Sequence, residues 1–175
     1  MTFNGTTQRL SGALTVLVNA MNGSSPYTLY YVGICTVTSG SPRYAVSCGD
    51  STQLRFVAHG WNSGDTAIYA RRDASSFKFN NGSLALLNVA HVAAYTWDGT
   101  NINMWQNGAS AISTTNAGTT VTPTDTFSIG SGYSLGSPAA FWCGSIGDVL
   151  IYTGQHSDEM RRKMETWLMN RYRLA

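Results

Sequence analysis

The sequence predicts an all-β fold, a two-sheet antiparallel sandwich that is closed by one C-terminal α-helix. Three observations predict it. Short apolar segments recur between clusters of Ser, Thr, Asn and Gly, which is the spacing of strands in a sandwich or barrel. Asp-Gly and Asn-Gly pairs flank a short alternating run, as they do in tight hairpins. The apolar period then changes from 2 to 3.6 after Gly154, where the helix is expected to begin.

The elements follow from these patterns in chain order. Strands are expected over residues 14–18, 27–38, 43–48, 54–59, 67–71, 76–80, 89–97, 101–106, 126–129 and 141–152. Turns are expected at Gly64-Asp65, Asn81-Gly82, Asp98-Gly99 and Asn107-Gly108. Residues 109–125 are rich in Thr, Ser and Ala with weak alternation, which indicates a long loop or an edge strand. The apolar run 10–18 is interrupted by Ser11, Gly12 and Thr15, which favours a buried strand over a signal peptide.

The closing helix is expected at about residues 157–172. Ser157 is a suitable N-cap, and Asp158 and Glu159 follow at the positive end of the helix dipole. One face then carries the apolar side chains, and most basic side chains fall on the other face. The apolar set is Met160, Met164, Trp167, Leu168 and Tyr172, and the basic set is Arg161, Arg162, Lys163 and Arg171. This face indicates packing onto the sandwich, with a partner-binding helix as the alternative.

Length and charge restrict the partners. At roughly 150 residues per domain, the 175 residues indicate one domain, residues 1–175. Residues 1–157 carry six acidic and six basic side chains, and residues 158–175 carry three acidic and five basic ones, which gives the net charge of +2. Each phosphate that is neutralised requires its own Lys or Arg, so we expect no nucleic-acid partner. No apolar run reaches the ~18 residues of a membrane span, so we expect no membrane partner.

The cysteines and acidic residues indicate no catalytic, metal or cofactor site. Cys35, Cys48 and Cys143 have neither CxxC nor Cys/His spacing, so buried reduced thiols are expected. Cys35 and Cys48 are the one pair near enough in sequence to share a hairpin, and the sequence leaves open whether they are bonded. We therefore expect no bound metal and no cofactor.

Three stretches together carry a family resemblance. They are residues 3–6 (FNGT), the run from His91 to Gly108 with its Trp97-Asp98-Gly99 and Asn107-Gly108 turns, and residues 144–152 (GSIGDVLIY) followed by Ser157-Asp158. They resemble the opening strand, central hairpin, and closing strand and helix of the concanavalin A-like jelly rolls, in particular the laminin G-like single domains found in phage virion proteins. The resemblance implies a jelly-roll sandwich, a fold that hosts lectins, glycosidases and virion proteins alike.

A glycosidase of this fold would need two carboxylates across the scissile bond, usually on one strand. The only glutamates, Glu159 and Glu165, lie on the expected helix, and the aspartates of the β region are isolated. Asp148 is the one carboxylate within a strong strand, where backbone N–H groups are expected to satisfy it. His59, His91 and His156 stand alone, and His91 in an apolar strand indicates a satisfied core histidine. We therefore expect a protein that is not an enzyme.

A lectin-like module is a stronger alternative, because sugars stack on exposed aromatic rings. Trp61 lies in the run HGWNSGD, which indicates a turn in which the ring could face solvent beside Asn62 and Asp65. These three residues are the candidate glycan site. The run DGTNIN from Asp98 has oxygens at intervals suited to calcium, although a hairpin turn requires the same residues.

The first-ranked interpretation is a structural protein of a virion surface, such as a phage capsid decoration protein. A chain that starts at Met1, carries little charge and consists of one lectin-like sandwich is typical of that class. The expected partners are a capsid or other virion protein, further copies of the chain, and a glycan if the lectin interpretation holds. The expected location is the virion surface, reached from the host cytoplasm without a signal peptide.

Overall fold

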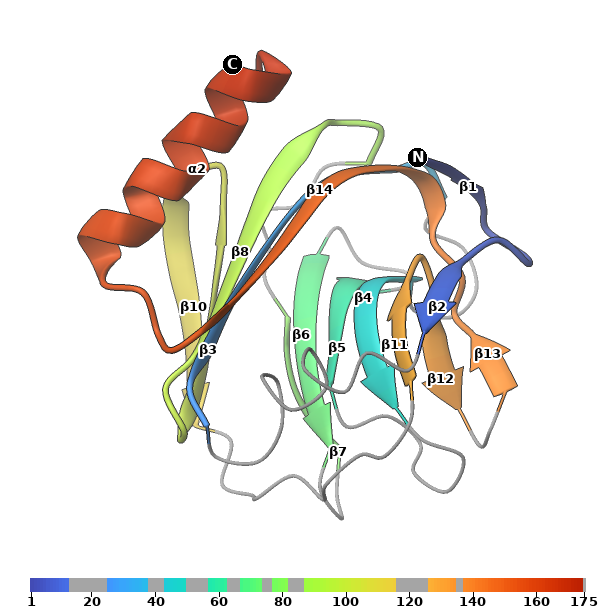
Figure 1. The fold of residues 1–175 in the computed structure, drawn as a ribbon, viewed down its shortest axis with the longest axis horizontal. Coiled ribbons are helices and arrows are strands. Elements are labelled where there is room, and N and C mark those ends of the chain that lie inside the picture. Colours follow the sequence, from blue (N-terminus) through green and yellow to red (C-terminus); the bar gives the residue numbers. More distant parts are fainter. Residues whose placement is uncertain are drawn as a thin grey trace.

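The computed structural model describes residues 1–12, 25–37, 43–49, 57–62, 67–73, 77–81, 87–115, 126–134 and 137–174. In these residues two antiparallel sheets face each other, and the helix α2 (Asp158–Tyr172) lies on the outer side of one of them (Figure 1). The predicted two-sheet antiparallel sandwich with a C-terminal helix is confirmed. Among the described helices, none is long and apolar enough to cross a bilayer.

The two sheets are called here the helix-bearing sheet and the second sheet. The helix-bearing sheet has the strand order β1 (Thr2–Asn4), β14 (Cys143–Thr153), β3 (Tyr27–Cys35), β8 (His91–Trp97), β9 (Asn101–Gln106) and β10 (Ala109–Thr115). The second sheet has the order β2 (Leu10–Gly12), β11 (Thr126–Ile129), β4 (Arg43–Gly49), β5 (Val57–Asn62), β6 (Ala67–Asp73) and β7 (Phe77–Asn81). A short hairpin, β12 (Gly132–Ser134) and β13 (Ser137–Ala139), adjoins β4.

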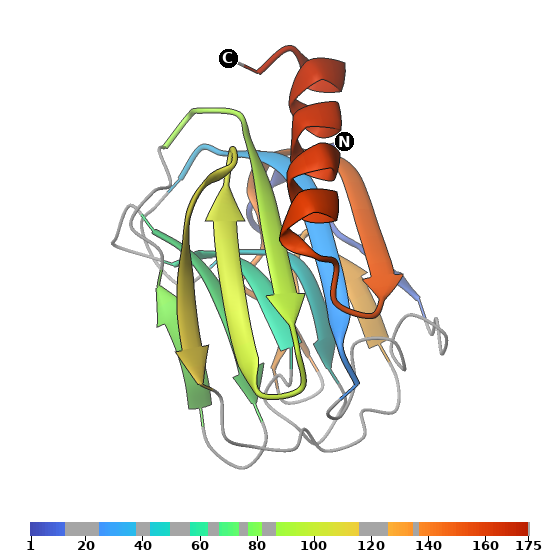
Figure 2. The same ribbon diagram turned by 90° about the vertical axis from the view of Figure 1, so that its left-hand side faces the viewer.

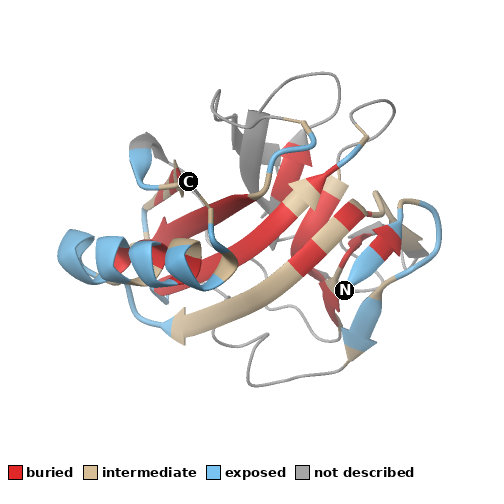
Figure 3. Ribbon diagram, turned by 90° about the horizontal axis from the view of Figure 1, so that it is seen from above, coloured by how far each residue is buried: buried red, intermediate tan, exposed pale blue. Residues whose placement is uncertain are grey.

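The main core lies between the sheets, and a second core lies under the helix. Side chains alternate along a strand, so Leu29 and Tyr31 of β3 face the second sheet, whereas Tyr30 and Val32 face α2. Figure 2 shows the helix crossing in front of β3 and β8, and Figure 3 shows the buried strands beneath it. Both faces of β3 and β8 are therefore covered, which explains why nearly every residue of these strands is buried.

Most predicted strands are confirmed. The expected strands 101–106 and 126–129 are found with the predicted bounds, and the other expected strands that fall on described residues are displaced by a few residues at their ends. Residues 109–115 form β10 at the edge of its sheet, which confirms the edge-strand alternative, while 116–125 and the expected strand 14–18 lie outside the described residues. Asn107 and Gly108 have φ values of 49° and 73°, the backbone of the predicted Asn-Gly hairpin turn.

The predicted helix is confirmed, but the predicted orientation of its faces is partly wrong. Ser157 Oγ accepts a hydrogen bond from the Met160 amide at 3.3 Å, as expected of an N-cap. The side turned to the sheet buries Arg161, Glu165 and Leu168. Met160 and Trp167, expected in the core, are 48% and 47% exposed. The helix is rotated so that a charged pair, which sequence patterning assigns to solvent, lies against the sheet.

The described cysteines are free thiols. Cys35 and Cys48 are buried, as predicted, whereas Cys143 is half-buried at the start of β14. Burial raises the pKa of the Cys35 thiol to about 11, and it also raises the pKa of Cys48. The buried thiols therefore stay protonated and act as small apolar groups.

Candidate functional site

Trp61, the predicted sugar platform, lies in β5, where it is paired with Arg43 of β4 and Ile68 of β6. Its indole has no exposed surface and belongs to the core between the sheets. The prediction that this ring faces solvent is therefore wrong. The strand continues as far as Asn62 instead of turning at Gly60, and the alternation of side chains directs Trp61 inward. A buried indole offers no face to a sugar ring.

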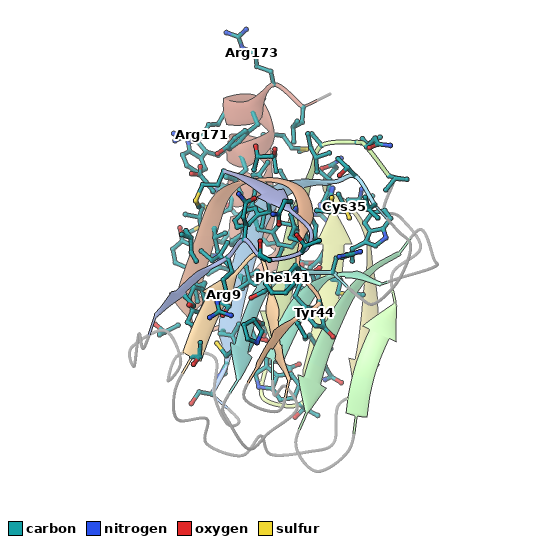
Figure 4. The ribbon with its side chains drawn as sticks, turned by 90° about the vertical axis from the view of Figure 1, so that its right-hand side faces the viewer. Arg9, Cys35, Tyr44, Phe141, Arg171 and Arg173 are labelled. Carbon is teal, nitrogen blue, oxygen red and sulfur yellow. The ribbon has the colours of Figure 1, made fainter. Side chains whose placement is uncertain are left out.

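The other two residues of the predicted glycan site, Asn62 and Asp65, are not tested by the structure. Asn62 is the last residue of β5, and Asp65 lies outside the described residues, so their role in glycan binding stays a prediction. The neighbouring strand β4 adds Arg43 near this strand end. Its Nη1 donates to the carbonyls of Gly5 and Phe141, at 2.8 and 2.9 Å, and Phe141 is labelled in Figure 4.

The carboxylates whose side chains the structure describes have structural partners. Asp148, in a bulge of β14, accepts from Arg171 Nε at 2.9 Å, so its partner is a cation of α2 and not the backbone N–H groups that were expected. The three carboxylates of the helix contact basic residues of the same helix; the pairs are Asp158–Arg161, Glu159–Lys163 and Glu165–Arg161. These contacts stabilise the fold and are not the arrangement of two carboxylates around a sugar that hydrolysis requires.

Asp98 organises the turn in which a calcium site was considered. Its Oδ1 accepts from the Thr100 and Asn101 amides at 2.7 and 2.6 Å, and its Oδ2 accepts from Asn101 Nδ2 at 3.1 Å. Burial alone would raise the pKa of Asp98, but these hydrogen bonds hold it below its ordinary value. Both carboxylate oxygens are thus engaged by the turn. No group of three or more metal-ligating side chains occurs within the residues that the structure describes.

His91 is the buried core histidine that the sequence predicts, although it is only half satisfied. Its Nδ1 lies 3.2 Å from the Val89 carbonyl, so this nitrogen carries the proton. Its Nε2 has no hydrogen-bond partner among the described residues. Burial lowers the pKa of His91 to about 4, because the charged ring would lose its hydration between the sheets.

The buried ring makes stability dependent on pH. With a folded pKa of about 4 and an unfolded pKa of about 6.5, the unfolded chain takes up the proton first as the pH falls. We expect stability to be complete above pH 6.5 and to fall by about 3 kcal/mol between pH 6.5 and 4. Urea unfolding of wild type and His91→Asn across this range measures the effect. The Asn variant keeps an N–H donor and cannot be protonated, so an equal pH slope in both proteins would contradict the assignment.

An aromatic and polar cluster lies where β14 leads into α2. Tyr30 Oη is 2.9 Å from His156 Nδ1, and the His156 and Tyr152 rings lie 4.6 Å apart. The His156 amide donates to Thr28 Oγ1 at 2.8 Å. Burial raises the pKa of Tyr30 and lowers that of His156, so at neutral pH the phenol donates to a neutral ring. The cluster is therefore a fixed surface with two half-exposed rings, Tyr152 and His156, and its imidazole contacts Tyr30 through Nδ1, which leaves Nε2 as the N–H group.

A buried ion pair joins the helix to the sheet, although the sequence predicts that one of its members, Arg161, lies on the face away from the apolar side chains. Arg161 and Glu165 are paired one turn apart, and both side chains are almost completely buried. The Arg161 guanidinium lies 4.2 Å from the centre of the Trp105 ring, a cation–π contact. Burial raises the pKa of Glu165, and Arg161 opposes that shift. The i, i+4 spacing of the two residues signals a pair, but it does not reveal which side of the helix is buried.

The fold is shared with proteins of known structure. The CBM40 of the Ruminococcus gnavus IT-sialidase, bound to α2,3 sialyllactose, is 13% identical with a TM-score of 0.76, over 94% of this chain and 96% of that one. The heptameric SAP-like pentraxin of Limulus polyphemus is 16% identical with a TM-score of 0.68, over 94% of this chain and 80% of that one. The NanB sialidase of Streptococcus pneumoniae is 12% identical with a TM-score of 0.73, but only 26% of it is covered, by 93% of this chain.

A search of curated proteins finds no match. The family comparison is decisive, because the model Laminin_G_3, described as concanavalin A-like lectin/glucanases superfamily, matches residues 6–159. That match takes in the start of the helix and every described strand except β1, and it confirms the resemblance to the laminin G-like domains of the concanavalin A-like superfamily. The chain therefore belongs to the laminin G-like family of the concanavalin A-like lectin/glucanase superfamily.

Proposed function

We propose that this protein is a non-catalytic carbohydrate-binding module. The observation that carries the proposal is the end-to-end correspondence with the CBM40 of the R. gnavus sialidase, which extends over 94% of this chain and 96% of that module. That module is named as bound to sialyllactose, so sialylated oligosaccharides are the first ligand class to test. The structural partners of the described carboxylates support binding over hydrolysis.

Two surfaces are proposed for the glycan. The first is the Tyr152–His156 pair, whose half-exposed rings can stack on a sugar while the imidazole N–H donates to a hydroxyl group. The second is the sequence-predicted region after β5, with Asn62 and Asp65. The first surface is preferred because its geometry is fixed by the contacts of His156 with Tyr30 and Thr28.

The test is calorimetric titration with 3′-sialyllactose, with lactose as the control that lacks sialic acid. We expect saturable binding that weakens at least about fivefold in His156→Ala, since a lost hydrogen bond is worth about 1 kcal/mol. Melting curves check that the variant stays folded. If Asn62→Ala and Asp65→Ala weaken binding instead, the site is the region after β5. No binding to any member of a glycan array would contradict the proposed function.

A second candidate is the virion-surface structural protein inferred from the sequence, located on the particle exterior. The observation that favours it is the exposed apolar pair Met160 and Trp167 on α2, which is a surface suited to protein contacts. Such a protein would co-purify with intact virions at a ratio comparable to the capsid protein. It would remain attached in molar NaCl, because apolar contacts are not screened. Absence from purified virions would contradict this candidate.

A further inference from the structure

A row of polar side chains crosses the outer face of the helix-bearing sheet. Strand pairing sets Tyr152 of β14 beside Thr28 of β3. The pairing continues from Thr28 to Thr96 of β8, and from Thr96 to Asn103 of β9. Because side chains alternate along each strand, these four lie on the same side of the sheet as Tyr30 and the helix. They are called here the polar row.

The helix covers the neighbouring row of side chains and ends its cover there. That neighbouring row is apolar and packs under α2; its members are Leu150, Tyr30, Ala94 and Trp105. The polar row lies beyond it, at the end of the sheet where β14 leads into α2. Figure 2 shows α2 beginning above the lower ends of β8 and β9, with no described element in front of these ends. The polar row therefore borders solvent beside the first turn of the helix.

The polar row has a buried floor and two half-buried ends. Thr28 and Thr96 are buried, whereas Asn103 at one end, and Tyr152 with its neighbour His156 at the other, are half-buried. The Thr28 hydroxyl is fully used, because it donates to the Gly154 carbonyl at 3.0 Å and accepts from the His156 amide at 2.8 Å. The side chains left to contact a ligand are thus those at the two ends.

The Asn103 amide is almost unused by the fold. Its Nδ2 lies 3.5 Å from Thr96 Oγ1, at the outer limit of a hydrogen bond, and its side chain makes no other hydrogen bond to the described residues. Asn101, on the same face of β9, differs in this respect, because its Nδ2 donates to Asp98 Oδ2 at 3.1 Å and stabilises the turn. Asn103 therefore keeps a carbonyl acceptor and N–H donors for a ligand.

We propose that the glycan site extends from the Tyr152–His156 pair along the polar row to Asn103, so that its ligand is an oligosaccharide lying across the strands. This inference rests on the proposed glycan function and names the size of the ligand. Three strand spacings of about 4.8 Å separate Tyr152 from Asn103, so the polar row spans about 14 Å. A single sugar ring is too short to contact both ends, whereas a trisaccharide reaches both.

The chemistry of the two ends assigns a different sugar to each. An amide both donates and accepts, as sugar hydroxyl groups do, and the polar row carries no charge that would compensate an ionised group. Asn103 therefore contacts a neutral sugar, and an apolar partner would leave its amide without a hydrogen bond. The rings of Tyr152 and His156 stack on the terminal sugar, and the His156 N–H donates to its carboxylate if that sugar is sialic acid.

Titration of the isotope-labelled whole chain with 3′-sialyllactose, and separately with its terminal sugar N-acetylneuraminic acid, tests the proposal. The NMR signals of the Asn103 side-chain amide, identified by their loss in Asn103→Ala, are expected to shift with the trisaccharide alone. Asn103→Ala is expected to weaken trisaccharide binding at least about fivefold and monosaccharide binding less than about twofold. His156→Ala is expected to weaken the binding of both.

A control and a double variant separate direct contact from indirect effects. Asn170→Ala is the matched control, because Asn170 is an exposed Asn on the outer side of α2, and it is expected to bind like wild type. His156 and Asn103 lie about two strand spacings apart, roughly 10 Å, and have no common hydrogen-bond partner among the described residues. Their losses in the double variant are therefore expected to add. Melting curves check that each variant stays folded.

The outcomes distinguish this inference from the proposed function. If wild type binds the trisaccharide and Asn103→Ala binds it equally well, the extension is overturned while the glycan function stands. A loss in Asn103→Ala that does not add to that of His156→Ala shows that Asn103 acts through His156, and this also overturns the extension. No binding of wild type to any glycan of an array contradicts both. If the array selects another oligosaccharide, that oligosaccharide and its terminal monosaccharide replace the two probes.

Discussion

Replacing Glu165 by Ala is expected to lower the free energy of unfolding by about 3–5 kcal/mol. The substitution removes the buried carboxylate that pairs with the Arg161 guanidinium against Trp105 and leaves the exposed Asp158, 3.5 Å from Arg161 Nε, as its carboxylate partner among the described residues. An exposed, longer contact compensates little for the hydration that the buried guanidinium has lost, so the cost exceeds that of the missing contact alone. Urea unfolding followed by circular dichroism measures it.

The helix supplies its own control. Glu159→Ala removes a carboxylate that pairs with Lys163 at the same spacing of four residues, but on the exposed side, and should cost less than about 1 kcal/mol. Replacing both buried partners, Arg161→Met with Glu165→Leu, should cost less than Glu165→Ala alone, because no charge then remains buried. Equal losses in Glu165→Ala and Glu159→Ala would show that the buried pair does not hold the helix to the sheet.

Replacing Trp61 by Ala is also expected to cost about 3–5 kcal/mol, because it removes a fully buried indole from the core between the sheets. The sequence alone suggested the opposite, since a ring in a surface turn would be dispensable for folding. In a protein of this size the loss corresponds to a melting temperature lower by about 10 °C.

Trp167→Ala is the matched comparison for this second substitution. Trp167 is 47% exposed, so its removal takes less apolar surface out of the protein and should cost about 1–2 kcal/mol, clearly less than Trp61→Ala. Thermal melts of both variants separate the two cases. A Trp61→Ala protein that melts like wild type would place the indole outside the core and revive its interpretation as a sugar platform.

The strands and turns were predictable because local chemistry specifies them. Alternation along residues 101–106 and the Asn107-Gly108 turn define β9 and its hairpin without information from the rest of the chain. The helix was predictable for the same reason, from its N-cap and its period. The pairing of strands was not predictable, because β14 pairs with β1 and β3, whose partner residues are more than a hundred positions away in the sequence.

The predictions for the site were wrong at residues whose polar sequence neighbours, or own charge, indicated exposure although the fold buries their side chains. The residue types that follow Trp61 in the sequence, Asn, Ser, Gly and Asp, are common in turns, and they therefore predicted a turn at Trp61. In the structure Trp61 instead continues β5, and its side chain points inward. Arg161 and Glu165 are charged, and charged side chains are expected in solvent. Their burial is explained only by the tertiary structure, which pairs them with each other and places the Trp105 ring beside Arg161. His156 gains its partner from Tyr30, which no short motif could indicate.

The position of β14 in the sheet has a consequence for how the chain folds as it is synthesised. β3 is synthesised more than a hundred residues before β14, one of its two neighbours, and α2, which covers its outer face, follows β14. Within the described residues, β1 is paired with β14 and must wait for it. Until then the nascent chain exposes the apolar outer face of β3, a surface for chaperones or for aggregation. Completion of the helix-bearing sheet therefore waits until β14 and α2 have been synthesised.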